Sequence, residues 1–157
     1  MHCYLVRHGD AVSAQFNPQR PLSVRGRAEV TELVRLALNR EIEVAELRHS
    51  GILRAQETAE ILAAYLKPPG GVQPAAGLMP EDDPEPVKAE LESVEKPIML
   101  VGHLPFMSRL AALLVNRDAA RSLFEFNPAT MLCCRKMGAG WQIEWQIAPS
   151  LSGFANT

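Results

Sequence analysis

The apolar positions of the chain fall into short runs and helical repeats that follow one another along the sequence. The runs have β-branched or aromatic members and end near glycine or polar residues, which is typical of buried strands. They cover residues 3–6, then 42–48, where Ile42, Val44 and Leu47 alternate with polar residues, and 98–101. We also expect a short strand around Val72 and Gln73, inside the Pro- and Gly-rich connection 67–80, and a hairpin of two antiparallel strands, 129–136 and 141–148.

Four further segments carry apolar residues at three- and four-residue spacing and predict helices. The first follows Ser23, a good N-cap, and ends near Asn39 or Arg40. The third follows Glu81-Asp82-Asp83, which we expect to cap it. The expected core faces are Val30, Leu33, Val34, Leu36 and Ala37; then Ile61, Leu62, Tyr65 and Leu66; then Val87, Leu91 and Val94; and finally Leu110, Ala111, Leu113 and Leu114.

The alternation of strands and helices predicts an α/β fold, a three-layer α/β/α sandwich with a mainly parallel central sheet. The chain has 157 residues, of which 47% are apolar and 22% charged, so we expect a single globular domain over residues 1–157. The polar end of the chain, residues 149–157, is expected to form a mobile tail.

The overall charge and the cysteines exclude several classes of protein. A net charge of −2 gives no basic surface for nucleic acid. No apolar run could span a bilayer and the chain leads straight into a strand, so we expect a cytoplasmic protein without a membrane partner. Cys3, Cys133 and Cys134 form neither a disulfide framework nor a metal-ligand spacing, and the four histidines form no such cluster either. We therefore expect buried thiols and no bound metal.

The candidate chemistry lies where the predicted strands end. Arg7 and His8 follow the first strand, and His103 follows the strand over 98–101. Arg54 lies within one turn of a predicted helix N-terminus, where free N–H groups already favour an anion. Since active sites of α/β folds form at the carboxyl ends of strands, these groups are expected to meet. Gly9 would let the backbone turn sharply and pass close to whatever the imidazole of His8 contacts.

Three segments, in order, resemble the signatures of the histidine phosphatase superfamily, the phosphoglycerate-mutase-like enzymes. Arg7-His8-Gly9 resembles the first. Residues 50–59, Ser-Gly-Ile-Leu-Arg-Ala-Gln-Glu-Thr-Ala, resemble the second, Ser-Pro-x-x-Arg-Ala-x-Gln-Thr-Ala, with Gly51 where proline is usual. Gly102-His103-Leu104-Pro105 is close to the third as the SixA-type phosphohistidine phosphatases have it, and Arg20-Pro21-Leu22-Ser23 resembles a further segment of that type. Because proline pre-organises a first helical turn, we expect Gly51 to loosen this helix start slightly.

The resemblance implies a mechanism and a residue for each role. His8 would attack phosphorus and become phosphorylated, while Arg7, Arg54 and His103 hold the phosphoryl oxygens. Arg20 would lie at the rim of the phosphate site, and water would then hydrolyse the phosphohistidine without a metal or other cofactor. Residues 127–128, Asn-Pro, are expected to turn the chain back towards this edge.

The substrate is predicted from two further features. A chain of this length leaves little room for a segment that would cover the site as a lid. An open site suits a phosphate displayed on another protein. Superfamily members that act on phosphate esters typically carry a Glu two residues after a Leu in this region, whereas here Leu78 is followed by Pro80, so no general acid is assigned. An imidazole leaves more readily than an alkoxide and depends less on such an acid.

We therefore expect a monomeric phosphatase of phosphohistidine on a protein, such as the histidine phosphotransfer domain of a sensor kinase. A small-molecule phosphomonoesterase of the same superfamily is one alternative. A non-catalytic phosphoprotein-binding module is another, although the presence of both His8 and His103 argues against it.

Overall fold

A computed structural model describes residues 1–116 and 125–151 of the chain. The strands are β1 (His2–Arg7), β2 (Glu46–His49), β3 (Val72–Pro74), β4 (Ile98–Gly102), β5 (Met131–Met137) and β6 (Gly140–Ile147). The helices are α1 (Val24–Leu38), α2 (Leu53–Leu66), α3 (Glu85–Ser93) and α4 (Phe106–Asn116).

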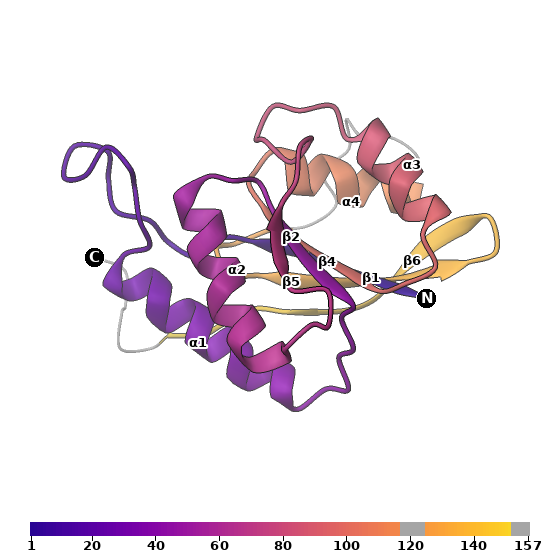
Figure 1. Cartoon of the computed structure of the whole chain (residues 1–157), viewed down its shortest axis with the longest axis horizontal. Helices are drawn as coiled ribbons and strands as arrows, with labels where there is room; N and C mark the ends of the chain where they lie inside the picture. Colours follow the sequence, from indigo (N-terminus) through magenta and orange to yellow (C-terminus); the bar gives the residue numbers. More distant parts are fainter. Residues whose placement is uncertain (117–124, 152–157) are drawn as a thin grey trace.

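The strands form one sheet in the order β3-β2-β4-β1-β5-β6. Strands β3, β2, β4 and β1 are parallel neighbours, whereas β5 pairs antiparallel with β1 on one side and with β6 on the other. Helices α1 and α2 cover one face of the sheet and α3 and α4 cover the other (Figure 1). This arrangement confirms the predicted three-layer sandwich with a mainly parallel sheet.

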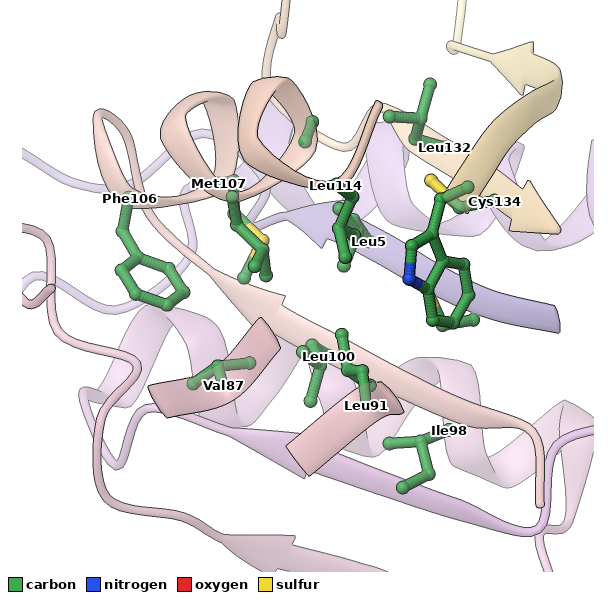
Figure 2. Packing of buried hydrophobic residues seen from close by; sticks show 14 of the residues in the cluster. Leu5, Val87, Leu91, Ile98, Leu100, Phe106, Met107, Leu114, Leu132 and Cys134 are labelled. Carbon is green, nitrogen blue, oxygen red and sulfur yellow. The ribbon is translucent and has the colours of Figure 1, made fainter. Parts of the chain in front are cut away.

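The sheet separates two hydrophobic cores, and β1 contributes to both. Cys3 and Leu5 point into the core beneath α3 and α4, while Tyr4 and Val6 point into the core beneath α1 and α2. In the first core, side chains from β1 and β4 pack against α3 and α4 (Figure 2). Because successive residues of a strand face opposite sides, a central strand with both faces covered must be apolar at every position, as this one is.

Helix α1 begins as predicted. Ser23 is the N-cap and its side-chain oxygen accepts a hydrogen bond from the backbone N–H of Gly26. The helix ends at Leu38 with Asn39 as C-cap, and its predicted core residues are buried except Leu36, which is half-buried. The N-cap hydrogen bond satisfies one of the free donors of the first turn and so fixes the point where the preceding loop ends.

The core face of α2 differs from the prediction at one position. Leu62 is buried, but Tyr65 is 53% exposed. The buried face is instead made by Ala55, Thr58 and Ala59 together with Leu62. Tyr65 therefore lies outside the face that α2 turns to the sheet.

Strand β2 is shorter than the alternating pattern from Ile42 suggests. It begins at Glu46, which pairs with Ile98, the first residue of β4. Residues 42–45 lie outside the strand, although the backbone N–H of Ala45 donates to the carbonyl of Pro97 over 2.8 Å and Val44 is buried.

The remaining elements follow the predictions. The hairpin of β5 and β6 turns at Gly138, and α3 begins after Pro84. Residues 149–151 have no regular structure, and the rest of the predicted tail lies outside the described residues. No helix in the described part of the chain is both long and apolar enough to cross a membrane.

Candidate active site

The carboxyl ends of β1 and β4 bring two histidines together. The two strands are parallel, with Arg7 in register with Gly102, so the residue after each strand lies at the same edge of the sheet. The backbone N–H of His8 donates to the carbonyl of Gly102 over 3.0 Å. The ring centroids of His8 and His103 lie 5.0 Å apart, with 54° between the ring planes.

The imidazole of His8 is oriented by its own neighbour in the chain. Its Nδ1 lies 2.6 Å from the carbonyl oxygen of Gly9. A carbonyl can only accept, so Nδ1 carries the proton and the lone pair is on Nε2. Burial, opposed by the Gly9 hydrogen bond and reinforced by the charges of Arg54, Arg7 and Arg20, lowers the pKa of His8 to about 4. His8 is therefore neutral at pH 7, as a nitrogen nucleophile must be.

His103 is held by Ser50 at the end of β2. Its Nε2 lies 2.6 Å from Oγ of Ser50, and the same Oγ accepts a hydrogen bond from the backbone N–H of Ile52. The Nδ1 atom of His103 is buried and has no hydrogen-bond partner among the described residues. Burial, followed by the charges of its neighbours, lowers the pKa of His103 to about 3. When the Ser50 hydroxyl donates a hydrogen bond to Nε2, the neutral ring carries its proton on Nδ1, where the N–H is free to meet an anion.

Two half-buried arginines complete this cluster. One N–H of Arg7 donates to the carbonyl of Phe126 over 2.8 Å. The Nε atoms of Arg7 and Arg54 are buried, and neither has a hydrogen-bond partner within 1–116 or 125–151. Burial lowers the pKa of both groups, and the nearby charge of Arg20 lowers that of Arg54 further. Buried cationic donors without partners fit an oxyanion.

Arg20 reaches the cluster from the loop between β1 and α1. Its backbone has a φ of 48°, and its Nε donates to the carbonyl of Val12 over 3.1 Å. Its charge lowers the pKa of His8 and of His103, which places it in the same electrostatic environment. The structure thus brings together the five predicted side chains, namely Arg7, His8, Arg20, Arg54 and His103.

The turn after His8 is packed too closely for a larger residue. A Cβ on Gly9 would lie 2.9 Å from the carbonyl oxygen of Gly26 and 2.9 Å from a methyl group of Val30. A Cβ on Gly26 would lie 1.9 Å from the carbonyl oxygen of Asp10. Both glycines are therefore needed for the turn to lie against α1, and Gly26 is a contributor that the sequence analysis did not identify.

Two hydroxyl groups were also missed as parts of the site. Ser50 and Thr58 appeared in the sequence only as parts of a motif. Thr58 is fully buried, accepts from the backbone N–H of Gly9 over 3.1 Å and donates to the carbonyl of Arg54 over 2.8 Å. It thereby fixes the turn after His8 to the helix that carries Arg54.

The expectation for Gly51 was wrong in its physical reason. Gly51 precedes the N-cap residue Ile52, so it lies outside the first helical turn. Its φ is +90°, which proline cannot adopt. Its N–H donates to Nδ1 of His49 over 3.0 Å, a hydrogen bond that proline could not make. Glycine here changes the path of the chain after Ser50 rather than loosening α2.

The segment after Leu78 passes beside the site without an assigned acid. The carbonyl of Leu78 would lie 3.5 Å from a Cβ on Gly102, so this segment reaches the end of β4. Pro80 stands where a Glu was considered, and Glu81 is exposed and 3.5 Å from Arg109. Asp83 accepts from the backbone N–H of Glu85 at the start of α3, which confirms a capping role for this carboxylate.

The turn at 127–128 returns the chain to this edge, as expected. The backbone N–H of Ala129 donates to the carbonyls of Arg7 and His8 over 3.0 and 3.2 Å. The site therefore receives groups from both ends of the described chain.

Comparisons with known proteins agree with this geometry. The family model of the histidine phosphatase superfamily (branch 1) matches residues 3–79. The chain is 25% identical over 154 residues to the phosphohistidine phosphatase SixA of Escherichia coli K12, covering 95% of this chain and 94% of that one.

Two solved structures share the fold of this chain. The protein histidine phosphatase SixA complexed with tungstate superimposes with a TM-score of 0.81 at 24% identity, over 94% of this chain and 97% of that chain. A mycobacterial glucosyl-3-phosphoglycerate phosphatase complexed with VO3 superimposes with a TM-score of 0.73 at 16% identity, over 94% and 99% of the two chains.

Proposed function

We propose that this chain is a member of the histidine phosphatase superfamily and hydrolyses phosphohistidine on a protein through a covalent intermediate on His8. The observation that carries the proposal is the state of His8. Its Nδ1–H is bound to Gly9, and its Nε2 lone pair belongs to a neutral ring surrounded by the charges of Arg7, Arg20 and Arg54.

In the first step, Nε2 of His8 attacks phosphorus. A new N–P bond forms as the N–P bond of the substrate breaks, and the departing imidazole takes up a proton from solvent. The guanidinium groups of Arg7 and Arg54 and the Nδ1–H of His103 receive the phosphoryl oxygens, because these are the buried donors without other partners. Arg20 contributes positive charge at the rim.

In the second step, water attacks the phosphorus of phospho-His8. The N–P bond breaks, inorganic phosphate is released, and the Nε2 lone pair of His8 is restored. The same three cations that keep His8 neutral stabilise the charge on the phosphoryl group in both steps. The residues at this edge thus supply a nucleophile and oxyanion donors, and we propose that they act without a metal.

Phosphohistidine is favoured over an ester by the chain around the site. Pro80 occupies the position considered for a general acid, and such an acid is worth about a hundred- to ten-thousand-fold with a poor leaving group. The connections after β2 and β4 are short, residues 50–52 and 103–105, and add no lid over the histidines. A site without an acid suits a phosphoryl group on the imidazole of another protein, and we propose a cytoplasmic phosphotransfer domain as the donor.

The test uses a purified histidine phosphotransfer domain labelled with radioactive phosphate on its histidine. Wild type, His8→Ala and His2→Gln are mixed with the donor and quenched at alkaline pH, where phosphohistidine survives. His2 lies at the opposite end of β1 and serves as the control. We expect transient label on wild type and His2→Gln, release of inorganic phosphate from both, and neither result for His8→Ala.

Other outcomes would reject the proposal in different ways. If the donor keeps its label while an aryl phosphate is hydrolysed, the enzyme is an ester phosphatase. If the donor binds but neither substrate turns over, the chain is a phosphoprotein reader. Equal dephosphorylation by wild type and His8→Ala would exclude His8 as the nucleophile.

A further inference from the structure

Three side chains from three strands meet at the end of the sheet opposite the active site. His2 is on β1, Cys133 on β5 and Glu144 on β6. Nε2 of His2 lies 2.7 Å from Oε2 of Glu144, and Sγ of Cys133 lies 3.7 Å from the same oxygen. One ligand atom of each residue lies within 4.8 Å of the other two. These three residues form no recognisable motif in the sequence, because only the pairing of the strands brings them together.

A β-bulge directs Glu144 into the group. Cys133 pairs with Trp145 and Cys134 pairs with Ile143, so Glu144 is the extra residue between these two pairs. Bulges commonly re-aim a side chain at a functional position. Cys134, the neighbour in sequence, points into the opposite core beneath α3 and α4 (Figure 2). The two adjacent cysteines therefore have different surroundings.

The donor set matches that of zinc sites. Imidazole nitrogen, thiolate sulfur and carboxylate oxygen are the usual ligands of Zn²⁺, at about 2.0–2.3 Å from the metal. Tetrahedral bonds of that length put ligand atoms on the order of 3.3–3.7 Å apart, so small side-chain movements would complete the geometry.

The contact between His2 and Glu144 has the distance of an ion pair but lacks the geometry of a hydrogen bond. Nε2 of His2 is buried and, despite its 2.7 Å distance to the carboxylate oxygen, has no hydrogen bond to any described residue. A buried ring nitrogen that faces a carboxylate without hydrogen-bond geometry is suited to a shared cation.

The surroundings favour entry of a cation. A cavity of about 590 Å³ borders His2 and is lined by Glu41, Glu43 and Glu95. The side chains of His2 and Glu144 are 36% and 39% exposed, whereas Nε2 of His2 and the side chain of Cys133 are buried. Opposing charges come from Arg40, whose guanidinium lies 4.4 Å over the ring of Trp145, and from Arg135, which lines a cavity with Glu144.

We propose that His2, Cys133 and Glu144 bind one Zn²⁺, with solvent as the fourth ligand. Binding displaces the thiol proton of Cys133 to solvent. The metal would tie the edge strand β6 to the central strand β1. Its position is remote from the phosphatase site, since His2 and His8 are six residues apart on β1, or roughly 20 Å. The role is therefore structural and independent of the proposed function.

The test is metal titration of chelator-treated full-length protein with Co²⁺ and with Zn²⁺. Co²⁺ bound to a thiolate gives a charge-transfer absorption band that Co²⁺ bound only to nitrogen and oxygen lacks. We expect this band with one Co²⁺ per chain, its loss when Zn²⁺ is added, and a Tm that rises with Zn²⁺ concentration. Cys133→Ser should abolish the band, whereas Cys134→Ser, the matched control in the opposite core, should keep it.

A second variant and an activity assay complete the design. His2→Gln changes a partly exposed side chain, and it should weaken Zn²⁺ binding and remove the rise in Tm without unfolding the protein. Dephosphorylation by wild type should be the same with and without Zn²⁺. A missing thiolate band in wild type, an equal band in Cys133→Ser, or unchanged Zn²⁺ affinity in His2→Gln would each overturn the proposal.

Discussion

His8 and His103 are neutral because burial outweighs every interaction that would stabilise their protonated forms. We expect histidine-selective NMR of the native protein to give a pKa of about 4 for His8 and about 3 for His103. Single His8→Asn and His103→Asn variants assign the signals. Titration of either ring near 6.5, the ordinary value, would contradict the environment described.

The lowered pKa of His8 also determines how the free energy of unfolding changes with pH. The unfolded chain protonates His8 near pH 6.5, whereas the native protein does so only near pH 4. Between these values the unfolded state holds more protons, so His8 makes the free energy of unfolding decrease as the pH falls from about 6.5 to about 4.

Ser50 is expected to act through His103 as a positioning residue. Ser50→Ala removes the hydroxyl that faces Nε2 of His103, and we expect kcat to fall by about tenfold to a hundredfold with little change in KM. The nitrogen chemical shifts of His103 should report a changed tautomer balance, and Ser50→Thr should restore part of the rate. Ser93→Ala, an exposed serine on α3, is the control. Unchanged His103 shifts in Ser50→Ala would refute this role.

Arg54 is expected to contribute a charge-assisted hydrogen bond to the phosphoryl group. Such a bond is worth about 1.5–3 kcal/mol, so Arg54→Ala should lower kcat/KM by a factor between about ten and somewhat more than a hundred. Arg35→Ala removes an exposed arginine that pairs with Glu32 on α1, and should leave the rate unchanged. Similar rates for Arg54→Ala and Arg35→Ala would show that Arg54 does not contact the reacting group.

At the scale of elements, the turn after β1 depends on how closely it approaches α1. Gly26→Ala places a Cβ against the carbonyl of Asp10 and must displace the turn that follows His8. We expect a loss of about 1–3 kcal/mol in urea unfolding, together with reduced phosphatase activity. Gly140→Ala is the matched control, since no atom lies within 4 Å of its added Cβ. Equal stability of the two variants would show that α1 can move away without cost.

The sequence alone was sufficient to predict the elements that are determined by local hydrophobic pattern and capping residues. The apolar strand β1, the Ser23 cap and the clustering of Arg7 with His103 follow from local pattern and from the rule that parallel strands end at one edge. The start of β2 at Glu46 could not be predicted from the sequence, because it depends on where β4 begins. The outward turn of Tyr65 and the contact of Thr58 with Gly9 likewise depend on packing between distant elements.

Over the whole molecule, one group of arginines and one group of glutamates lie at opposite ends of the sheet. Arg7, Arg20 and Arg54 meet at the phosphatase edge, whereas the glutamates lining the cavity beside His2 lie at the other end. With a net charge of −2, the attraction for a phosphoryl group is local rather than global.

This charge separation predicts a salt effect on the capture of substrate. Raising NaCl from about 0.05 to 0.5 M should lower kcat/KM for the labelled phosphoprotein several-fold, while kcat changes little. Salt screens the long-range attraction that precedes binding, but it screens the short contacts within the enzyme–substrate complex much less. Arg20→Ala should flatten the salt dependence and Arg35→Ala should preserve it. A salt-independent kcat/KM in wild type would exclude steering by this edge.

The position of β4 between β1 and β2 has a consequence for synthesis on the ribosome. The strand that carries His8 is made before its two neighbours in the sheet, which begin at Ile98 and Met131. Until those segments emerge, β1 has no partner on either edge and an apolar strand is exposed. His8 therefore reaches its folded surroundings only after most of the described chain has been made, and until then the edges of β1 are open to wrong pairing or to a chaperone.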